Sequence, residues 1–516
     1  MKVSHAFLMG VAAAHIVLWG AWGNAADVAG DRAPVVTVGS KGFPESWILG
    51  AALASLAERD GAARAVHKKN LGGTEITYQA LKTGSIDIYP EYTGTISEVI
   101  LKGRADKSYG AMRAALAEAD IAMSDPLGFN DGYALAVARS TAQRLGLVTL
   151  SDLKAHPELR LGLTHEFIGR ADGYPGLSNR YGLAMRDVRG VQHELAYEAL
   201  ARDQIDVMDI YTTDPQIAKL SLVLLRDDLG FFPRYDAVLL YRRDLEARAA
   251  AALRAMTELA ARIDENIMMR ANAAVADGGM SAETAAQRLL GDALGELRPP
   301  PSPNAGGQGL AARTFRNVIR HLELVGVSLF FAVLIGVPLG VCATRSRTVA
   351  VISLAGAGLL QTVPSLALLA FLIPLFGIGT APALVALFVY GLLPIVQSTF
   401  TGLTSIPSSL SEAADAIGLR PATKLIRVAL PMASPAILSG IKTSAVINVG
   451  TATLAALIGA EGLGNPILQG IALRDTGLIL EGSIPAAFLA LAVQATFSWL
   501  DALLVPKGLR LSSRAP

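Results

Sequence analysis

Arg298-Pro-Pro-Pro-Ser-Pro-Asn-Ala-Gly-Gly-Gln-Gly309 separates two halves of the chain that differ sharply in composition. Residues 35–298 carry charges, turn residues and mixed periodicity, which are typical of a domain surrounded by water. Residues 321–505 consist instead of long apolar runs interrupted by one polar loop. Stretches rich in Pro and Gly are typical of linkers. We therefore predict an aqueous domain over 35–298, a linker over 299–314 and a membrane domain over 315–506, with a function at or across a bilayer.

Composition excludes several classes of protein. The chain has 516 residues, which is more than one ordinary domain. Its net charge of +1 creates no global field that would attract nucleic acid, so no nucleic-acid partner is expected. The single cysteine, Cys342, excludes an intrachain disulfide and a zinc site made of thiolates. The histidines lack metal-ligand spacings such as H-E-x-x-H, so we expect no metal or other cofactor and no enzyme activity.

The N-terminus has the pattern of an export segment. A basic start, Met1-Lys2, precedes an apolar stretch to about Gly23 and the small residues Ala25 and Ala26. This pattern predicts that residues 1–26 are a signal peptide or an uncleaved anchor. Either alternative delivers the aqueous domain outside the cytoplasm.

The membrane half contains five apolar segments, each long enough to cross ~30 Å of hydrocarbon as a helix. They lie at about 321–343, 349–377, 381–402, 435–459 and 484–505. The second contains Pro364 and Pro374, so we expect it to be kinked or split and the crossings to number five or six. The positive-inside rule then places three basic connections in the cytoplasm. They carry Arg345 and Arg347; Arg420, Lys424 and Arg427; and Lys507, Arg510 and Arg514.

The polar loop of this half is Ser411-Glu-Ala-Ala-Asp-Ala-Ile-Gly-Leu-Arg-Pro-Ala-Thr-Lys-Leu-Ile-Arg-Val-Ala-Leu-Pro431. Ser411 is expected to cap a helix that begins with Glu412. Gly418 is expected to end that helix, and Pro421 to start the next one. These signals predict a short helix–turn–helix on the cytoplasmic face.

The same loop resembles the E-A-A-x(3)-G-x(9)-I-x-L-P loop of binding-protein-dependent ABC permeases, from which it departs only at Val428. Ile458-Gly-Ala-Glu-Gly-Leu-Gly-Asn465 resembles the Gly-rich segment of the same family. The resemblance implies an all-α polytopic permease domain that pairs as a homodimer and docks on a cytoplasmic ABC ATPase. The residues it assigns to ATPase coupling are Glu412, Ala413, Ala414, Gly418 and Pro431. The chain has no G-x-x-x-x-G-K-[ST] phosphate loop, so a separate subunit must hydrolyse ATP.

The aqueous half contains an internal repeat. Residues 78–93 and 197–212 both lead from a helix end through Ile-Asp into a short strand and then Tyr-Thr. Two α/β lobes with equivalent strands would produce this pattern, although coincidence in a helix–strand unit is the alternative. Ligands of open α/β sheets bind beyond the carboxyl ends of the strands. We therefore expect Tyr92 and Tyr211 to face one cleft from opposite sides.

Two basic residues occupy corresponding positions in this repeat. Lys41 follows the predicted strand 35–38, and Arg170 follows the predicted strand 159–163. A cation beside a helix N-terminus is suited to hold a carboxylate. The alternative is that both side chains are simply solvated, as Lys and Arg usually are.

Four stretches of this half resemble the extracellular binding proteins for glycine betaine, choline and related quaternary amines. They are residues 39–43, 86–95, 129–137 and 209–214. The second of them contains the string Tyr-Pro-Glu-Tyr-Thr-Gly-Thr. The resemblance implies a bilobal α/β periplasmic-binding-protein fold of type II. It also implies that a box of tyrosines surrounds the ligand's trimethylammonium group, that Asp131 adds negative potential, and that Lys41, Thr95 and Arg170 hold a carboxylate. The tyrosines of the box would be Tyr92, Tyr133, Tyr211 and Tyr235, although the segment around Tyr235 departs from the family's pattern.

Quaternary ammonium chemistry supports this interpretation. The group has no N–H to donate, but aromatic faces attract it by roughly 0.5–2 kcal/mol per ring. The sequence thus predicts a fused substrate-binding and permease subunit of an ABC importer in the inner membrane, for glycine betaine, proline betaine, choline or carnitine. The pair of Lys41 and Arg170 favours a ligand with a carboxylate. Two alternatives are an importer of ergothioneine or another betaine, and a ligand-gated sensor, which would have no use for the 411–431 loop.

Overall fold

The computed structural model describes residues 33–102, 104, 106–276, 279–295, 309–473 and 475–504. The predicted export segment, most of the predicted linker and the basic residues after Pro506 lie outside these ranges. The first helix of the membrane half begins at Leu310, so the last residues of the stretch predicted as linker are helical.

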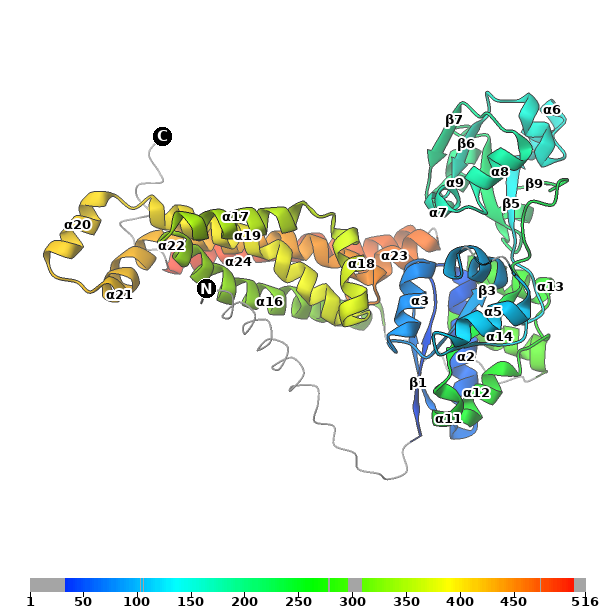
Figure 1. Ribbon diagram of the computed structural model, residues 1–516, viewed down its shortest axis with the longest axis horizontal. Helices are drawn as coiled ribbons and strands as arrows, with labels where there is room; N and C mark the ends of the chain where they lie inside the picture. Colours follow the sequence, from blue (N-terminus) through cyan, green and yellow to red (C-terminus); the bar gives the residue numbers. More distant parts are fainter. Residues whose placement is uncertain are drawn as a thin grey trace. The chain divides into compact units, whose positions relative to one another are not determined.

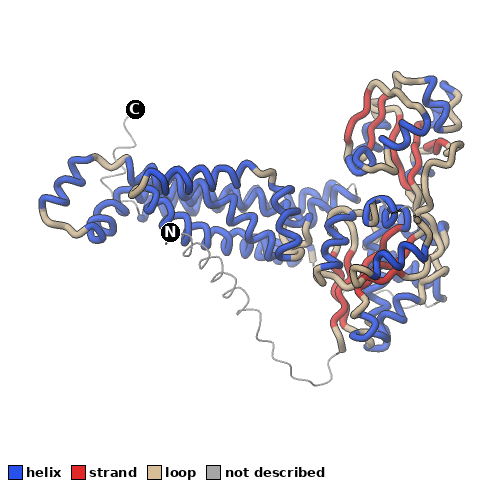
Figure 2. Tube along the Cα trace, in the orientation of Figure 1, coloured by secondary structure: helices blue, strands red, loops and turns tan. Residues whose placement is uncertain are grey.

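The aqueous half consists of two α/β lobes, each built on a five-stranded sheet (Figures 1 and 2). The strands of the first lobe are β1 (Val35–Gly39), β2 (Arg64–Lys68), β3 (Ile88–Tyr92), β4 (Ile121–Met123) and β10 (Ala237–Arg242). Those of the second are β5 (Tyr133–Ala138), β6 (Arg160–Leu163), β7 (Asp187–Gly190), β8 (Val207–Tyr211) and β9 (Leu222–Leu225). Their orders, β2-β1-β3-β10-β4 and β7-β6-β8-β5-β9, correspond strand by strand, and in each sheet one strand, β10 or β5, runs antiparallel to the other four. The structure therefore confirms the predicted repeat.

Helices cover these sheets. The main ones of the first lobe are α2 (Pro44–Ala57), α3 (Thr74–Lys82), α5 (Tyr109–Ala117), α12 (Ala250–Thr257), α13 (Glu265–Ala276) and α14 (Ala282–Leu294). Those of the second are α6 (Arg139–Leu145), α7 (His165–Gly169), α8 (Tyr174–Tyr181) and α9 (His193–Ala201). Ser108, Thr164 and Ser281 cap α5, α7 and α14 by accepting a backbone N–H. The core lies between helices and sheets, where Val38 and Val207 are fully buried.

The repeated Ile-Asp dipeptide has a structural role. Asp87 accepts the backbone N–H of Thr37 at 2.7 Å, and Asp206 accepts that of Arg160 at 2.9 Å. Each carboxylate joins the start of one central strand to its parallel neighbour. The equivalent strands β3 and β8 consequently end at equivalent places, with Tyr92 and Tyr211 as their last residues.

Two segments, 124–132 and 226–236, cross between the lobes. They pair with each other where Asn130 bridges to Asp236. The N–H of Tyr235 donates to Oδ1 of Asn130 at 2.7 Å, and the N–H of Asp131 donates to the carbonyl of Tyr235 at 3.1 Å. These bonds place Asp131 and Tyr235 side by side.

The membrane half is a bundle of helices (Figure 2). Its main elements are α16 (Leu310–Ala343), α17 (Arg347–Thr362), α18 (Ser365–Phe376), α19 (Thr380–Thr404), α22 (Leu430–Thr451), α23 (Gly464–Ala472) and α24 (Thr476–Leu504). Four helices of the described chain are long and apolar enough to cross a membrane, or five crossings if α17 and α18 form one broken span. These two are bent by 99° at Pro364, as the prolines predicted, whereas a sixth crossing is not found in the described part. Buried polar groups join the bundle, since Asn448 donates to Ser328 at 3.2 Å.

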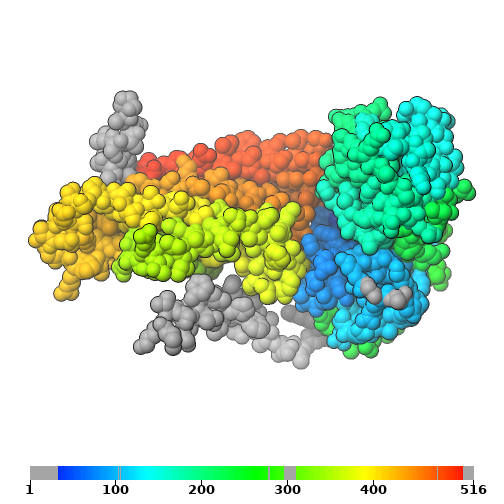
Figure 3. All heavy atoms as spheres, turned by 45° about the horizontal axis from the view of Figure 1, so that its top comes forward, coloured from blue at the N-terminus to red at the C-terminus, as the bar shows by residue number. Residues whose placement is uncertain are grey.

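The polar loop forms two short helices, α20 (Ser408–Ala416) and α21 (Pro421–Lys424), which project beyond the rest of the bundle (Figures 1 and 3). Ser411 does not cap α20, because the helix starts one turn earlier, after Pro407. Gly418 follows α20 with a φ of 76°, and Pro421 begins α21, both as predicted. Lys424 binds both carboxylate oxygens of Asp415 at 2.8 Å and closes the turn.

Candidate functional site

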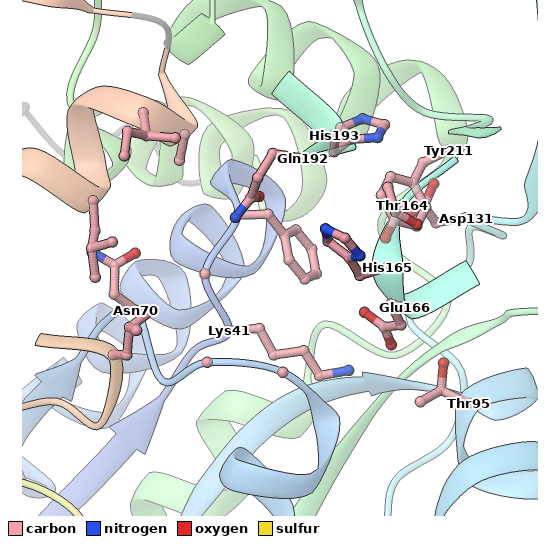
Figure 4. Close-up of a pocket in the computed structure, with 18 of the residues that line it drawn as sticks. Lys41, Asn70, Thr95, Asp131, Thr164, His165, Glu166, Gln192, His193 and Tyr211 are labelled. Carbon is pink, nitrogen blue, oxygen red and sulfur yellow. The ribbon is translucent and has the colours of Figure 1, made fainter. Parts of the chain in front are cut away.

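A cavity of about 380 Å³ lies at the carboxyl ends of β3 and β8. Seven of the eight predicted substrate-binding residues line it, namely Lys41, Tyr92, Thr95, Asp131, Tyr133, Tyr211 and Tyr235. Arg170 is not among the lining residues. Figure 4 shows Lys41 and Thr95 of the first lobe opposite Thr164, His165 and Glu166 of the second. Four apolar residues of the membrane half complete the wall: Leu457, Leu468, Ile471 and Ala472.

Aromatic rings surround Tyr133. Its ring centroid lies 5.1 Å from that of Tyr211 and 5.4 Å from that of Tyr235, which it meets edge to face. Phe167 approaches it to 5.1 Å, and Phe43, which sequence analysis did not assign to the site, stacks on Tyr211 at 6.2 Å. Aromatic faces of this kind attract a cation and exclude water.

The backbone approaches Tyr235 closely at Gly94. A Cβ atom on Gly94 would lie 2.4 Å from the Tyr235 ring. Only glycine therefore fits at position 94 while Tyr235 keeps its place beside Tyr133.

Lys41 is paired with a carboxylate of the protein. Its ammonium lies 2.5 Å from Oε1 of Glu91 and 3.0 Å from the hydroxyl of Thr74. Glu91 is fully buried and also accepts the hydroxyl proton of Tyr89 at 3.0 Å and the N–H of Tyr92 at 3.0 Å. The charge of Lys41 is thus neutralised inside the first lobe.

Arg170 is paired as well. The sequence pattern placed it beside a helix N-terminus, but it follows the end of α7, because Thr164 already caps the start of that helix. Two of its nitrogens contact Asp172, at 2.8 and 2.5 Å, and a third lies 3.2 Å from Glu166. Its guanidinium stands 5.4 Å from the ring centroid of Tyr133. The hydroxyl of Tyr235 donates to Asp172 at 2.7 Å, so the arginine and the rings are held as one group.

A second buried acid, Glu45, lies behind the rings. It accepts the hydroxyl proton of Tyr92 at 2.6 Å and an amide N–H of Asn272 at 2.8 Å. The Thr213 hydroxyl lies 2.7 Å from Glu45 and 2.7 Å from Asp131. Burial raises the pKa of Glu45, and burial together with the charge of Glu45 raises the pKa of Asp131.

Sequence reasoning did not assign Glu45, Thr213 or Asn272 to the site. Glu45 lies two residues after the 39–43 stretch, and Thr213 lies within the 209–214 stretch, so a search of residues in and near the motifs would have found both. Asn272 on α13 has no such signal, because only the packing of α13 brings it to Glu45.

Comparison with known proteins assigns both halves. Residues 34–292 match the family described as the substrate binding domain of ABC-type glycine betaine transport systems, and residues 332–509 match the binding-protein-dependent transport system inner membrane component. The osmoprotectant import permease protein OsmW of Salmonella typhimurium is 43% identical over 206 residues, which are 39% of this chain and 94% of that protein. The choline transport system permease protein OpuBB of Bacillus subtilis is 40% identical over 190 residues, 37% of this chain and 88% of that protein. A crystal structure of a glycine betaine/carnitine/choline ABC transporter covers 49% of this chain and 97% of its own, with 31% identity and a TM-score of 0.43.

We expect Glu91→Ala to destabilise the protein by about 3–5 kcal/mol, because the ammonium of Lys41 would stay buried without its carboxylate. Denaturant-induced unfolding of the full chain in detergent would measure the loss. The double variant Lys41→Met/Glu91→Gln removes both charges, keeps an acceptor for Tyr89 and Tyr92, and should recover most of it. Glu118→Ala, which removes the exposed partner of Arg104, is the control and should leave the midpoint unchanged. If Glu91→Ala left the unfolding midpoint unchanged, as this control should, the burial of Lys41 would not depend on its ion pair with Glu91.

Proposed function

Because the chain belongs to the binding-protein-dependent ABC importers of the glycine betaine type, with their substrate-binding and permease domains in one polypeptide, we propose that the cavity between its lobes captures the imported quaternary amine. The protein is the fused substrate-binding and permease subunit of an osmoprotectant importer in the inner membrane. Transport by this family requires a partner ATPase. The aqueous half lies on the extracytoplasmic side, where it meets the solute first.

The arrangement of the rings around Tyr133 carries this proposal. Tyr211, Tyr235 and Phe167 approach Tyr133 within 5.4 Å, and Asp131 lines the same cavity. A trimethylammonium group gains from ring faces and from a nearby carboxylate, and its desolvation costs less than that of an ammonium with N–H groups because it donates no hydrogen bond to water.

The charge balance of the cavity wall supports a cation without a carboxylate. Lys41 is paired with Glu91, and Arg170 is paired with Asp172 and Glu166. The sequence favoured a ligand carboxylate because Lys41 and Arg170 could hold one, but both cations contact carboxylates of the protein. We therefore favour choline over glycine betaine as the ligand.

The membrane half supports import over sensing. In our proposal a second copy of the chain completes the pore, and α20 and α21 dock on the ATPase. Ile417, beside the Gly418 turn, is 75% exposed, which suits a segment that inserts into a partner's groove. A sensor that moves no solute would have no use for this projection.

Replacement of Tyr211 tests the cage. Tyr211→Ala should weaken choline binding by at least about tenfold, whereas Tyr211→Phe should be milder, because the ring face supplies the attraction. Titration calorimetry of the full chain in lipid nanodiscs would measure both, with Tyr174→Ala, outside the cavity wall, as the control. Equal and negligible effects of the two Tyr211 variants would remove this residue from the site.

A ligand panel tests the charge balance. Choline should bind at least about tenfold more tightly than glycine betaine. The carboxylate of the betaine would find no cation to pair with, because Lys41 and Arg170 are already bound by carboxylates of the protein. The same calorimetric titration measures both affinities. Tighter binding of glycine betaine would mean that Lys41 or Arg170 exchanges its protein partner for the ligand.

Replacement of Gly418 tests the coupling assignment. Gly418→Leu should disturb the turn after α20, because a side chain at a φ of 76° costs about 1–2 kcal/mol. Uptake into vesicles and ligand-stimulated ATP hydrolysis should fall, while choline affinity stays the same. Gly418→Asn, which tolerates this conformation, is the matched control and should retain more transport. A Gly418→Leu protein that holds its ATPase and transports normally would contradict the assignment.

A further inference from the structure

The hydroxyl of Thr213 has two carboxyl groups as neighbours but only one proton. Its Oγ1 lies 2.7 Å from Oε2 of Glu45 and 2.7 Å from Oδ1 of Asp131. A hydroxyl can donate to one of them only. The second contact becomes a hydrogen bond if the other carboxyl carries a proton and donates it to Oγ1. Two charged carboxylates would leave this second contact repulsive.

The surroundings of Glu45 and Asp131 also disfavour two charges. Their exposed fractions are 4% and 7%, and burial raises the pKa of both groups. The partners of Glu45 on β3 and α13 are neutral, the hydroxyl of Tyr92 and the amide of Asn272. Oδ1 of this buried amide has no hydrogen-bond partner in the described part of the chain. The amide turns an N–H group toward Glu45, which gives the carboxyl group a hydrogen bond but no neutralising charge.

The charged groups on the neighbouring elements are already paired. On the first lobe, Lys41 is held by Glu91. On the second lobe, Asp214 lies 3.1 Å from the ring of His193, and its charge adds to the effects that raise the pKa of Asp131.

Two further acids of the second lobe have partners of their own. Asp209 accepts two hydrogen bonds from Thr164, and Glu166 is held by Arg170. No cation of the described chain forms an ion pair with Glu45 or Asp131 at 4.0 Å or less.

We propose that Glu45 and Asp131 share one proton while the cavity is empty and release it to solvent when a quaternary ammonium enters the cage. This inference rests on the proposed function, since it takes the cage as the cation site. Asp131 lines the cavity with the aromatic rings, whereas Glu45 acts through Thr213 and Tyr92 and is a positioning residue. The O–H bond of one carboxyl breaks, the proton goes to water, and the ligand's charge replaces it.

The shared proton gives the site its specificity for charge. While the cavity is empty, the shared proton leaves the Glu45–Asp131 pair with one negative charge. A second buried negative charge without a cation beside it is thereby avoided. A neutral ligand of the same shape offers no charge to replace the proton. Binding of a cation lowers the pKa of the pair. Ligand affinity should therefore rise with pH by up to about tenfold per pH unit. The rise should stop once the pH exceeds the raised pKa of the empty site, because the pair then has no proton left to release.

Calorimetry of the full chain in nanodiscs tests this linkage. Choline is titrated between pH 5 and 8 in phosphate, Hepes and Tris buffers, whose protonation enthalpies differ. The slope of binding enthalpy against buffer enthalpy should show release of up to about one proton per choline. The uncharged carbon analogue 3,3-dimethyl-1-butanol should release none.

Variants identify the source of the proton. Glu45→Gln and Thr213→Val should abolish the release, whereas Thr213→Ser keeps the hydroxyl and should preserve it. His165→Asn and His193→Asn are controls for the histidines that line the cavity, and they should retain the release. Proton release that survives in Glu45→Gln would come from another group and would overturn the inference.

The two proposals can fail separately. Tight binding of choline with no proton release over the whole pH range would overturn the shared proton and leave the proposed function standing. Failure of the folded protein to bind any quaternary amine would overturn the proposed function itself.

Discussion

The hydrogen bonds of one buried carboxylate, that of Glu45, connect the parts of the aqueous half that form the cavity. They join α2 to Tyr92 at the end of β3, to Thr213 in the turn after β8, and to Asn272 on α13. A carboxyl group this far from water needs such partners, because a buried charge without them costs several kcal/mol. Since the partners come from both lobes, the wall behind the aromatic rings exists only while the lobes keep this arrangement.

Charge pairing decides what the cavity can accept. Both cations near the rings, Lys41 and Arg170, are held by carboxylates of their own lobes. Ring faces and the carboxyl group of Asp131 line the cavity beside these paired cations. Such a wall is suited to a cation that needs no hydrogen bond, and in our proposal it discriminates by charge as well as by shape. The same pairing keeps the empty protein stable, because few buried charges lack a partner.

The membrane half contains two kinds of helix, long packed ones and the two short helices of the polar loop. Its long helices pack through small and weakly polar residues, whereas α20 and α21 are short, polar and exposed. The turn between them depends on the left-handed backbone of Gly418 and on the pairing of Lys424 with Asp415. A projection held by local contacts can move as one piece, and this property suits a segment that transmits motion from an ATPase to a pore.

The sequence by itself determined the two halves, the repeat of the lobes and the turn at Gly418, because these features follow from local composition and short-range periodicity. It also placed Tyr92 and Tyr211 at strand ends, since equivalent strands end alike. The prediction that Ser411 caps α20 was wrong, because a helix can start earlier than the residue with the strongest capping preference. Only the tertiary structure decided that Lys41 and Arg170 are paired and that Asn272 reaches Glu45. Ion pairs and buried hydrogen bonds depend on which elements pack together, and a chain read one residue after another does not contain that information.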